Sequence, residues 1–100
     1  MEIQLWTWSG TYFGYRDGDD LFDCNGRRVG RFHGKEIFGR DGRYLGELRK
    51  RDRLITDRTK LALMKDALKP RRHGPRNFGP LDPLALPADY RDFPKPEELP

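Results

Sequence analysis

A sixteen-residue pattern recurs along the first half of this chain. Bulky apolar pairs occur four times, at spacings of 16, 16 and 17 residues: Leu5-Trp6, Leu21-Phe22, Ile37-Phe38 and Leu54-Ile55. Two glycines follow each of the first three pairs at fixed offsets: Gly10 and Gly14, Gly26 and Gly30, Gly42 and Gly46. A period this short corresponds to one supersecondary element that cannot bury its apolar face alone, so neighbouring copies must pack together.

Each copy has the pattern of a strand, a tight turn and a second strand. In the second copy, Asn25-Gly26 separates two apolar-alternating stretches, and Asp41-Gly42 does so in the third. These dipeptides favour two-residue type I′ hairpins, in which both central residues have positive φ. The sequence therefore predicts an all-β fold of short antiparallel β-hairpin repeats of about 16 residues. They form one domain over residues 1–68, with units near 3–18, 19–34, 35–51 and 52–68.

The second glycine of each unit lies inside an expected strand, where glycine normally weakens the structure. Gly14, Gly30 and Gly46 repeat this cost three times, directly after Phe13, Val29 and Leu45. We therefore expect another backbone to approach closely at these positions, or the strand to kink there.

The fourth unit is irregular, and residues 57–69 leave two alternatives open. In one, a strand from Arg53 to Thr56 pairs with a strand from Lys60 to Met64. In the other, Asp57 caps a helix that places Leu61, Met64, Ala67 and Leu68 on one face.

The C-terminal third has a different composition, since all eight prolines lie in residues 70–100. Proline lacks an N–H donor and excludes long helices and central strands. We expect residues 69–100 to form a Pro-rich C-terminal arm, partly extended or docked. Tyr90 and Phe93 could anchor this arm on the repeats, on a sister subunit or on another protein.

These units, with an apolar-aromatic pair, a D/N-G turn and a glycine after an apolar residue, resemble a small bacterial family, the four-fold β-flower. The resemblance covers residues 1 to about 63, and the ending from Ala88 to Glu97 is also similar. It implies β-hairpin repeats with pseudo-four-fold symmetry around an axis. It implies no activity.

Positive charge is concentrated in residues 49–76, which contain 11 Lys/Arg against 3 Asp/Glu. Clustered cations bind phosphates through counterion release, so this segment is a candidate contact for nucleic acid or another polyanion. A solvated face that blunts a sheet edge explains the same pattern. The candidate contacts are Arg49, Lys50, Arg51, Arg53, Arg71 and Arg72.

The residues that could carry catalysis are few. Cys24 would need a base, and the only histidines are His33 and His73. These three match no usual metal-ligand spacing, and Asp17-Gly18-Asp19-Asp20 is explained by turn formation rather than by a calcium loop. We predict no catalytic residue, no cofactor and no metal.

Two alternating tryptophans could place one ring in the core and one outside. Trp6 and Trp8, with Tyr90 and Phe93, are the candidate interface residues. The N-terminus has no signal-peptide pattern, no stretch is long and apolar enough to span a membrane, and a single cysteine fits a reducing compartment, so we expect a cytoplasmic protein.

The sequence favours a non-enzymatic protein-binding or assembly module, acting as an oligomer or with a protein partner. The alternative is binding of nucleic acid or polyanion through residues 49–76. An enzyme with an unrecognised site is third.

Overall fold

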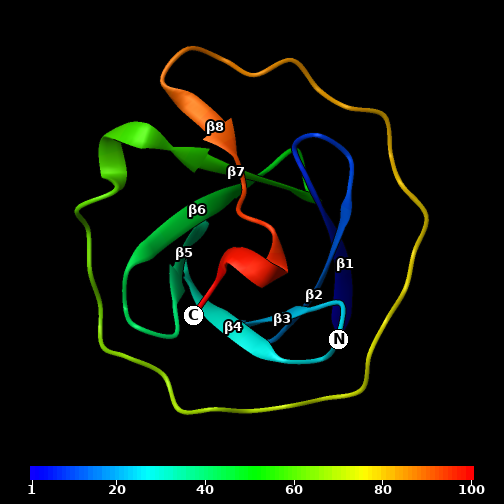
Figure 1. The fold of residues 1–100 in the computed structure, drawn as a ribbon, viewed down its shortest axis with the longest axis vertical. Coiled ribbons are helices and arrows are strands. Elements are labelled where there is room, and N and C mark those ends of the chain that lie inside the picture. The colour runs from blue at the N-terminus through cyan, green and yellow to red at the C-terminus, as the bar shows by residue number, and fades with distance from the viewer.

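The computed structural model describes residues 1–100 and contains only strands and two single-turn 3-10 helices (Figure 1). The strands are β1 (Glu2–Thr7), β2 (Tyr12–Asp17), β3 (Asp20–Asp23), β4 (Arg28–His33), β5 (Glu36–Gly39), β6 (Tyr44–Arg49), β7 (Arg53–Asp57) and β8 (Tyr90–Asp92). The helices are η1 (Arg58–Lys60) and η2 (Pro96–Glu98). The all-β prediction is confirmed.

The first seven strands form a closed barrel. Each strand from β1 to β7 pairs antiparallel with the next, and β1 then pairs parallel with β7 to complete the circle. On that edge of β7, β1 pairs with Arg53 and Leu54, while β8 pairs with Ile55 to Asp57. Two segments from opposite ends of the chain therefore divide one strand edge between them.

The turns between paired strands differ from the expected type. The connections after β1, β3 and β5 span four residues, and only the glycine of each dipeptide has positive φ: +97° at Gly10, +82° at Gly26 and +87° at Gly42. Asn25 and Asp41 stay at negative φ, so the type I′ prediction is wrong. The reason is a hydrogen bond within the turn: Asp23 Oδ1 accepts from the N–H of Asn25 at 2.9 Å, which stabilises a longer connection.

The second glycines lie where strands crowd together. A Cβ on Gly14, Gly30 or Gly46 would overlap a backbone carbonyl oxygen of the neighbouring strand, namely that of Phe22, Phe38 or Ile55. The expectation of close backbone approach is confirmed. The pairing register also shifts within the first three apolar pairs, as a β-bulge does, at Leu5/Trp6, Leu21/Phe22 and Ile37/Phe38.

Two apolar layers result from the apolar pairs. The first residue of each pair faces the barrel interior and joins the residues that precede the second glycines. The inner core consists of Leu5, Phe13, Leu21, Val29, Phe32, Ile37, Leu45, Leu54 and Phe93. The second residues form an outer layer, in which Phe22 and Ile55 are fully buried and Phe38 almost so.

Residues 57–69 are neither a strand pair nor a long helix. Asp57 does act as an N-cap, accepting from the N–H of Thr59 at 2.9 Å, but the helix it caps is the single turn η1. The chain then becomes extended, and Met64 forms an isolated antiparallel bridge with Arg43. Backbone hydrogen bonds to the barrel therefore overrode the helical propensity of this stretch.

Residues 61–87, which we call the strap, encircle the barrel (Figure 1). Three strap N–H groups donate to the carbonyls of the three turn glycines: Lys65 to Gly42 at 2.8 Å, His73 to Gly26 at 2.6 Å and Leu81 to Gly10 at 2.9 Å. Three more strap N–H groups donate to the carbonyls of the residues two positions before those glycines: Leu68 to Arg40, Arg76 to Cys24 and Leu84 to Trp8. Strap donors are eight residues apart, acceptors are sixteen apart, and the two series run in opposite directions.

The strap also covers the outer aromatic layer. The His73 ring stacks on Phe22 with centroids 4.1 Å apart, and Lys65 Nζ lies 5.6 Å from the centre of Phe38. Phe78 contacts Trp6 edge-on at 6.3 Å. Three points along the strap thus each cover one aromatic side chain of the outer layer.

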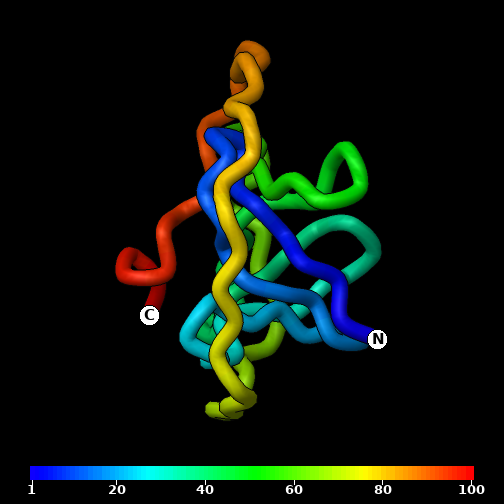
Figure 2. Tube along the Cα trace, turned by 90° about the vertical axis from the view of Figure 1, so that its right-hand side faces the viewer, coloured from blue at the N-terminus to red at the C-terminus, as the bar shows by residue number.

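The C-terminal end closes one mouth of the barrel. Phe93 is buried against Phe13, with ring centroids 5.1 Å apart, and Leu99 packs on the same core. In Figure 2 the C-terminus lies on one side of the barrel, and the turns near residues 34 and 51 project on the other.

Gly26→Ala should destabilise the protein more than Gly34→Ala. Both glycines have positive φ, which costs alanine about 1–2 kcal/mol. A Cβ at Gly34 meets nothing within 4 Å, whereas at Gly26 it overlaps the His73 carbonyl of the strap. We expect Gly26→Ala to lose a further ~1–3 kcal/mol in urea unfolding, as overpacking does. Equal losses in the two variants would contradict a tightly docked strap.

Candidate functional site

Both tryptophans of the predicted interface hold the strap in place. Trp8 is buried, and its indole N–H donates to the Ala85 carbonyl at 2.9 Å. Trp6 is half-buried, and its indole N–H donates to the Gly79 carbonyl at 2.8 Å. Both side chains are therefore occupied within their own chain.

The other two candidate interface residues anchor the C-terminal segment. Phe93 fills the barrel mouth, as described above. Tyr90 is half-buried and starts β8, and its ring lies under the Arg49 guanidinium at 4.5 Å from the ring centre. The structure thus gives each of the four residues a contact within its own chain: the tryptophans bind the strap, Phe93 fills the barrel mouth and Tyr90 contacts Arg49.

The basic segment is divided between two places. Arg49 ends β6, Lys50 and Arg51 lie in the β6–β7 turn and Arg53 starts β7. Arg71 and Arg72 lie on the strap. Arg53 is buried and donates to the carbonyls of Trp8 at 3.1 Å and Asp82 at 2.6 Å. Arg53 therefore supports the strap, while Lys50 and Arg51 remain exposed at the turn.

The backbone of that turn is unusual. Lys50 and Arg51 both have positive φ, at 49° and 69°. This connection contains the extra residue that lengthens the last repeat spacing to 17. Positive φ costs non-glycine residues energy, so the insertion is accommodated with local strain.

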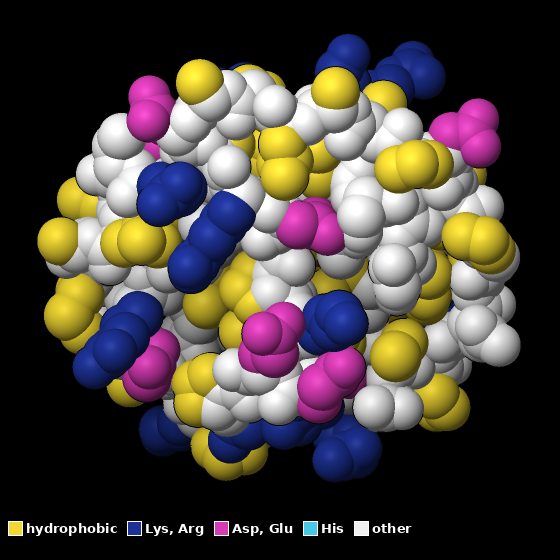
Figure 3. All heavy atoms as spheres, turned by 45° about the horizontal axis from the view of Figure 1, so that its top comes forward, with side chains coloured by type: hydrophobic (Ala, Val, Ile, Leu, Met, Phe, Trp, Pro, Cys, Tyr) yellow, Lys and Arg dark blue, Asp and Glu magenta, His cyan; other side chains and the backbone are white.

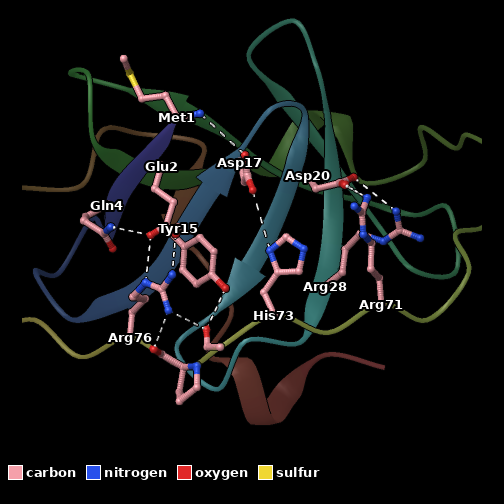
Figure 4. A network of polar contacts seen from close by, with 12 residues as sticks. Met1, Glu2, Gln4, Tyr15, Asp17, Asp20, Arg28, Arg71, His73 and Arg76 are labelled. Carbon is pink, nitrogen blue, oxygen red and sulfur yellow. Dashed lines mark hydrogen bonds and ion pairs between the residues drawn. The ribbon is translucent and has the colours of Figure 1, made fainter.

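One acidic residue of the Asp17–Asp20 run has a role that the sequence pattern did not reveal. Asp20 is buried at the start of β3 and lies 3.0 Å from the guanidinium group of Arg71 and 3.4 Å from that of Arg28 (Figure 4). Arg31 lies at 3.4 Å as a third guanidinium neighbour. A buried carboxylate is tolerated only when it is paired in this way. Asp20 therefore ties the strap to the barrel.

A second contact between strap and barrel lies beside it. Arg76 forms an ion pair with Glu2 at 2.5 Å, and the Tyr15 hydroxyl donates to the Gly74 carbonyl at 2.8 Å (Figure 4). His73 Nδ1 is 3.8 Å from Asp17. Charged groups from β1 to β3 thus contact the strap along residues 71–76.

The candidate nucleophile Cys24 shares a hollow of about 880 Å³ with His73. The thiol is half-buried, and burial together with the neighbouring Asp23 raises its pKa. An activated cysteine has a lowered pKa, so this environment is opposite to that of a catalytic thiolate. His33 lies elsewhere, edge-on to Phe38 at 5.3 Å.

Metal-binding groups and membrane-spanning helices are also absent. No three His, Cys, Asp or Glu side chains are grouped so that they could hold a metal ion. None of the helices has the length and apolar character needed to cross a membrane. On the face seen in Figure 3, basic, acidic and apolar side chains are intermixed rather than sorted by charge.

Glu47 is a buried charge that the sequence did not single out. Its carboxylate accepts from the Tyr44 hydroxyl and from Lys60 Nζ, both at 3.0 Å, and Lys60 also contacts Glu36 at 2.9 Å. Burial alone would raise the pKa of Glu47, but the hydrogen bonds from Lys60 and Tyr44 outweigh it and lower the pKa. The same contacts, with Glu36 first, raise the pKa of Lys60.

Comparison with known proteins identifies a family. A family model described as 4-fold beta flower protein matches residues 3–96. The family suggested by the repeat pattern is therefore confirmed. No curated protein and no solved structure matches the chain.

Glu47→Gln should lower stability at neutral pH, and the loss should shrink in acid. Because the folded-state pKa of Glu47 is lowered, its carboxylate contributes stability above the unfolded pKa of about 4.3, and this contribution disappears as pH falls through the folded pKa. Removing one partner from a buried polar network costs about 1–3 kcal/mol. Urea unfolding at pH 7 and pH 3 measures both values.

Glu97→Gln is the matched control, since Glu97 is exposed. It should change stability little at either pH. A Glu47→Gln loss of the same size at pH 3 as at pH 7 would contradict the assigned role of the carboxylate.

Proposed function

We propose that this chain, which belongs to the 4-fold beta flower protein family, is a non-enzymatic module that assembles with protein. The observation that carries the proposal is an exposed apolar segment at the start of the strap. Leu61 and Leu63 are each 43% exposed and Met64 is 60% exposed. Large apolar side chains gathered on a surface are typical of interaction sites.

The backbone fixes this segment in place. The Leu63 carbonyl accepts from the Tyr44 N–H at 3.1 Å, and the Lys65 N–H donates to Gly42 at 2.8 Å. These two bonds flank Met64 and hold its backbone against the β5–β6 connection. A rigid apolar surface loses little conformational freedom on association, which favours binding.

Charge favours a second copy of the chain as partner. Three exposed cations lie close to the apolar segment: Arg58 and Lys65 in the sequence, and Arg43 across the backbone bridge to Met64. Residues 77–100 carry 5 Asp/Glu against 2 Lys/Arg, so another copy offers an acidic surface. Complementary potentials favour such a contact.

We also interpret the barrel as four related hairpin units about a pseudo-four-fold axis, with the proline-rich arm wrapped outside them. The recurring bulges and the glycine turns that accept from the strap support this interpretation. The single cysteine, which fits a reducing compartment, and the bacterial family that the repeats resemble support a cytoplasmic setting.

Binding of nucleic acid or another polyanion is the second candidate function. It is supported by the exposed pair Lys50 and Arg51, which project from the β6–β7 turn with no carboxylate partner. Heparin retention that falls steeply with salt and is reduced by neutralising this pair would favour it. An enzyme remains the third candidate.

Met64→Glu should abolish self-association. A charge at Met64, the most exposed residue of the apolar segment, must be desolvated on assembly, which weakens binding strongly. Light scattering across a concentration series should give a mass at least twice that of one chain for the native protein and the single-chain mass for the variant.

Ile3→Glu provides the matched control, because Ile3 is 43% exposed on β1 and belongs neither to the 61–64 segment nor to residues 77–100. It should assemble like the native protein. A native protein with the single-chain mass at every concentration, or equal effects of the two variants, would contradict assembly through the 61–64 segment.

A further inference from the structure

Four arginines line one small cleft beside the strap. The lining residues are Arg27, Arg40, Pro70, Arg71 and Arg72, and the cleft has a volume of about 300 Å³. No acidic side chain is among them. The arginines come from the connection after β3, the connection after β5 and the strap, so docking of the strap creates the cleft.

The local carboxylates do not neutralise this charge. Arg27 contacts Asp23 at 3.3 Å, and Arg71 contacts Asp20 at 3.0 Å, but Asp20 is shared with two further arginines. Arg72 pairs with no Asp or Glu and donates to the Asn25 carbonyl at 3.5 Å. Arg40 also pairs with no Asp or Glu, and it donates to an oxygen of the C-terminal residue Pro100 at 3.5 Å. No acidic side chain thus neutralises these two guanidinium groups.

Guanidinium groups favour a particular kind of ligand. Their planar fork of donors matches the oxygens of phosphate, and such charge-assisted pairs are stronger than neutral hydrogen bonds. The backbone on both sides of the cleft is fixed, since Leu68 donates to Arg40 and His73 donates to Gly26. The arginines are therefore already gathered before a ligand arrives.

A second hollow adjoins the cleft and shares Arg27 and Arg72 with it. This hollow, of about 880 Å³, is also lined by polar and aromatic groups, among them Thr11, Asn25 and His73. Both volumes fall in the range of small-molecule sites. Asp23 and Glu97 line the hollow but not the cleft, so the potential would direct an anionic group toward the arginines.

We propose that the arginine cleft binds the phosphate groups of a phosphorylated small molecule, whose uncharged body occupies the adjoining hollow. This site goes beyond the assembly role proposed above, because none of its residues belongs to the 61–64 segment. It also differs from polyanion binding, which needs only a high density of exposed charge.

Titration calorimetry of the full chain with pyrophosphate and with ADP tests the proposal. The native protein should bind both probes, ADP more tightly, and adenosine only weakly or not at all. The double variant Arg40→Gln, Arg72→Gln should lose at least about 10-fold in affinity for both, as expected when two charge-assisted hydrogen-bonding groups are removed. Thermal unfolding of the variant checks that it still folds.

The double variant Lys50→Gln, Arg51→Gln is the matched control, with the same loss of charge outside the cleft. It should bind both probes like the native protein. Equal affinity for pyrophosphate and ADP would overturn occupation of the hollow. Absence of binding, or equal losses in the two double variants, would overturn the cleft itself. In that case, salt-sensitive heparin retention and the light-scattering mass would still report separately on the two functions proposed above.

Discussion

Backbone hydrogen bonds between the strap and the three glycine turns are the constraint on which the rest of this structure depends. They require glycine at Gly10, Gly26 and Gly42, because positive φ and contact with a strap carbonyl both exclude a Cβ. They hold the side chains that cover the outer aromatic layer, and they bring Arg71 and Arg72 beside the arginines of the barrel turns. A barrel without the strap would expose its second apolar layer to water.

The acceptors on the barrel are sixteen residues apart and the donors on the strap are eight residues apart, and this difference has a simple geometric origin. The molecule measures about 33 × 32 Å in the plane of the ring. Eight residues of extended chain reach about 25 Å, which is roughly a quarter of the circumference of this ring. The barrel uses sixteen residues between successive glycine turns because the chain passes through two antiparallel strands there, such as β2 and β3 between Gly10 and Gly26. An extended strap of one turn therefore meets successive turns every eight residues.

The sequence predicted the features that depend on side-chain size and burial, but not those that depend on backbone hydrogen bonds. The apolar pairs and the second glycines were informative, because burial and steric crowding select residue types directly. The strap register was not, because its bonds come from N–H groups of unrelated residues such as Lys65, His73 and Leu81. The helical propensity of residues 60–68 misled for the same reason. The arginine cleft could not be anticipated, since Arg27 and Arg40 meet Arg71 and Arg72 only after the strap has docked.

The shared edge of β7 has a consequence for how the chain reaches its native state. Its partners β1 and β8 lie at opposite ends of the sequence, and Phe93, which completes the core, follows directly after β8. Contacts of such large sequence separation raise contact order and slow folding. During synthesis the amino-terminal strands emerge first, yet Phe93, which fills their centre, is made after all seven barrel strands. A nascent chain must therefore keep one mouth of its hydrophobic interior open until this side chain has been made.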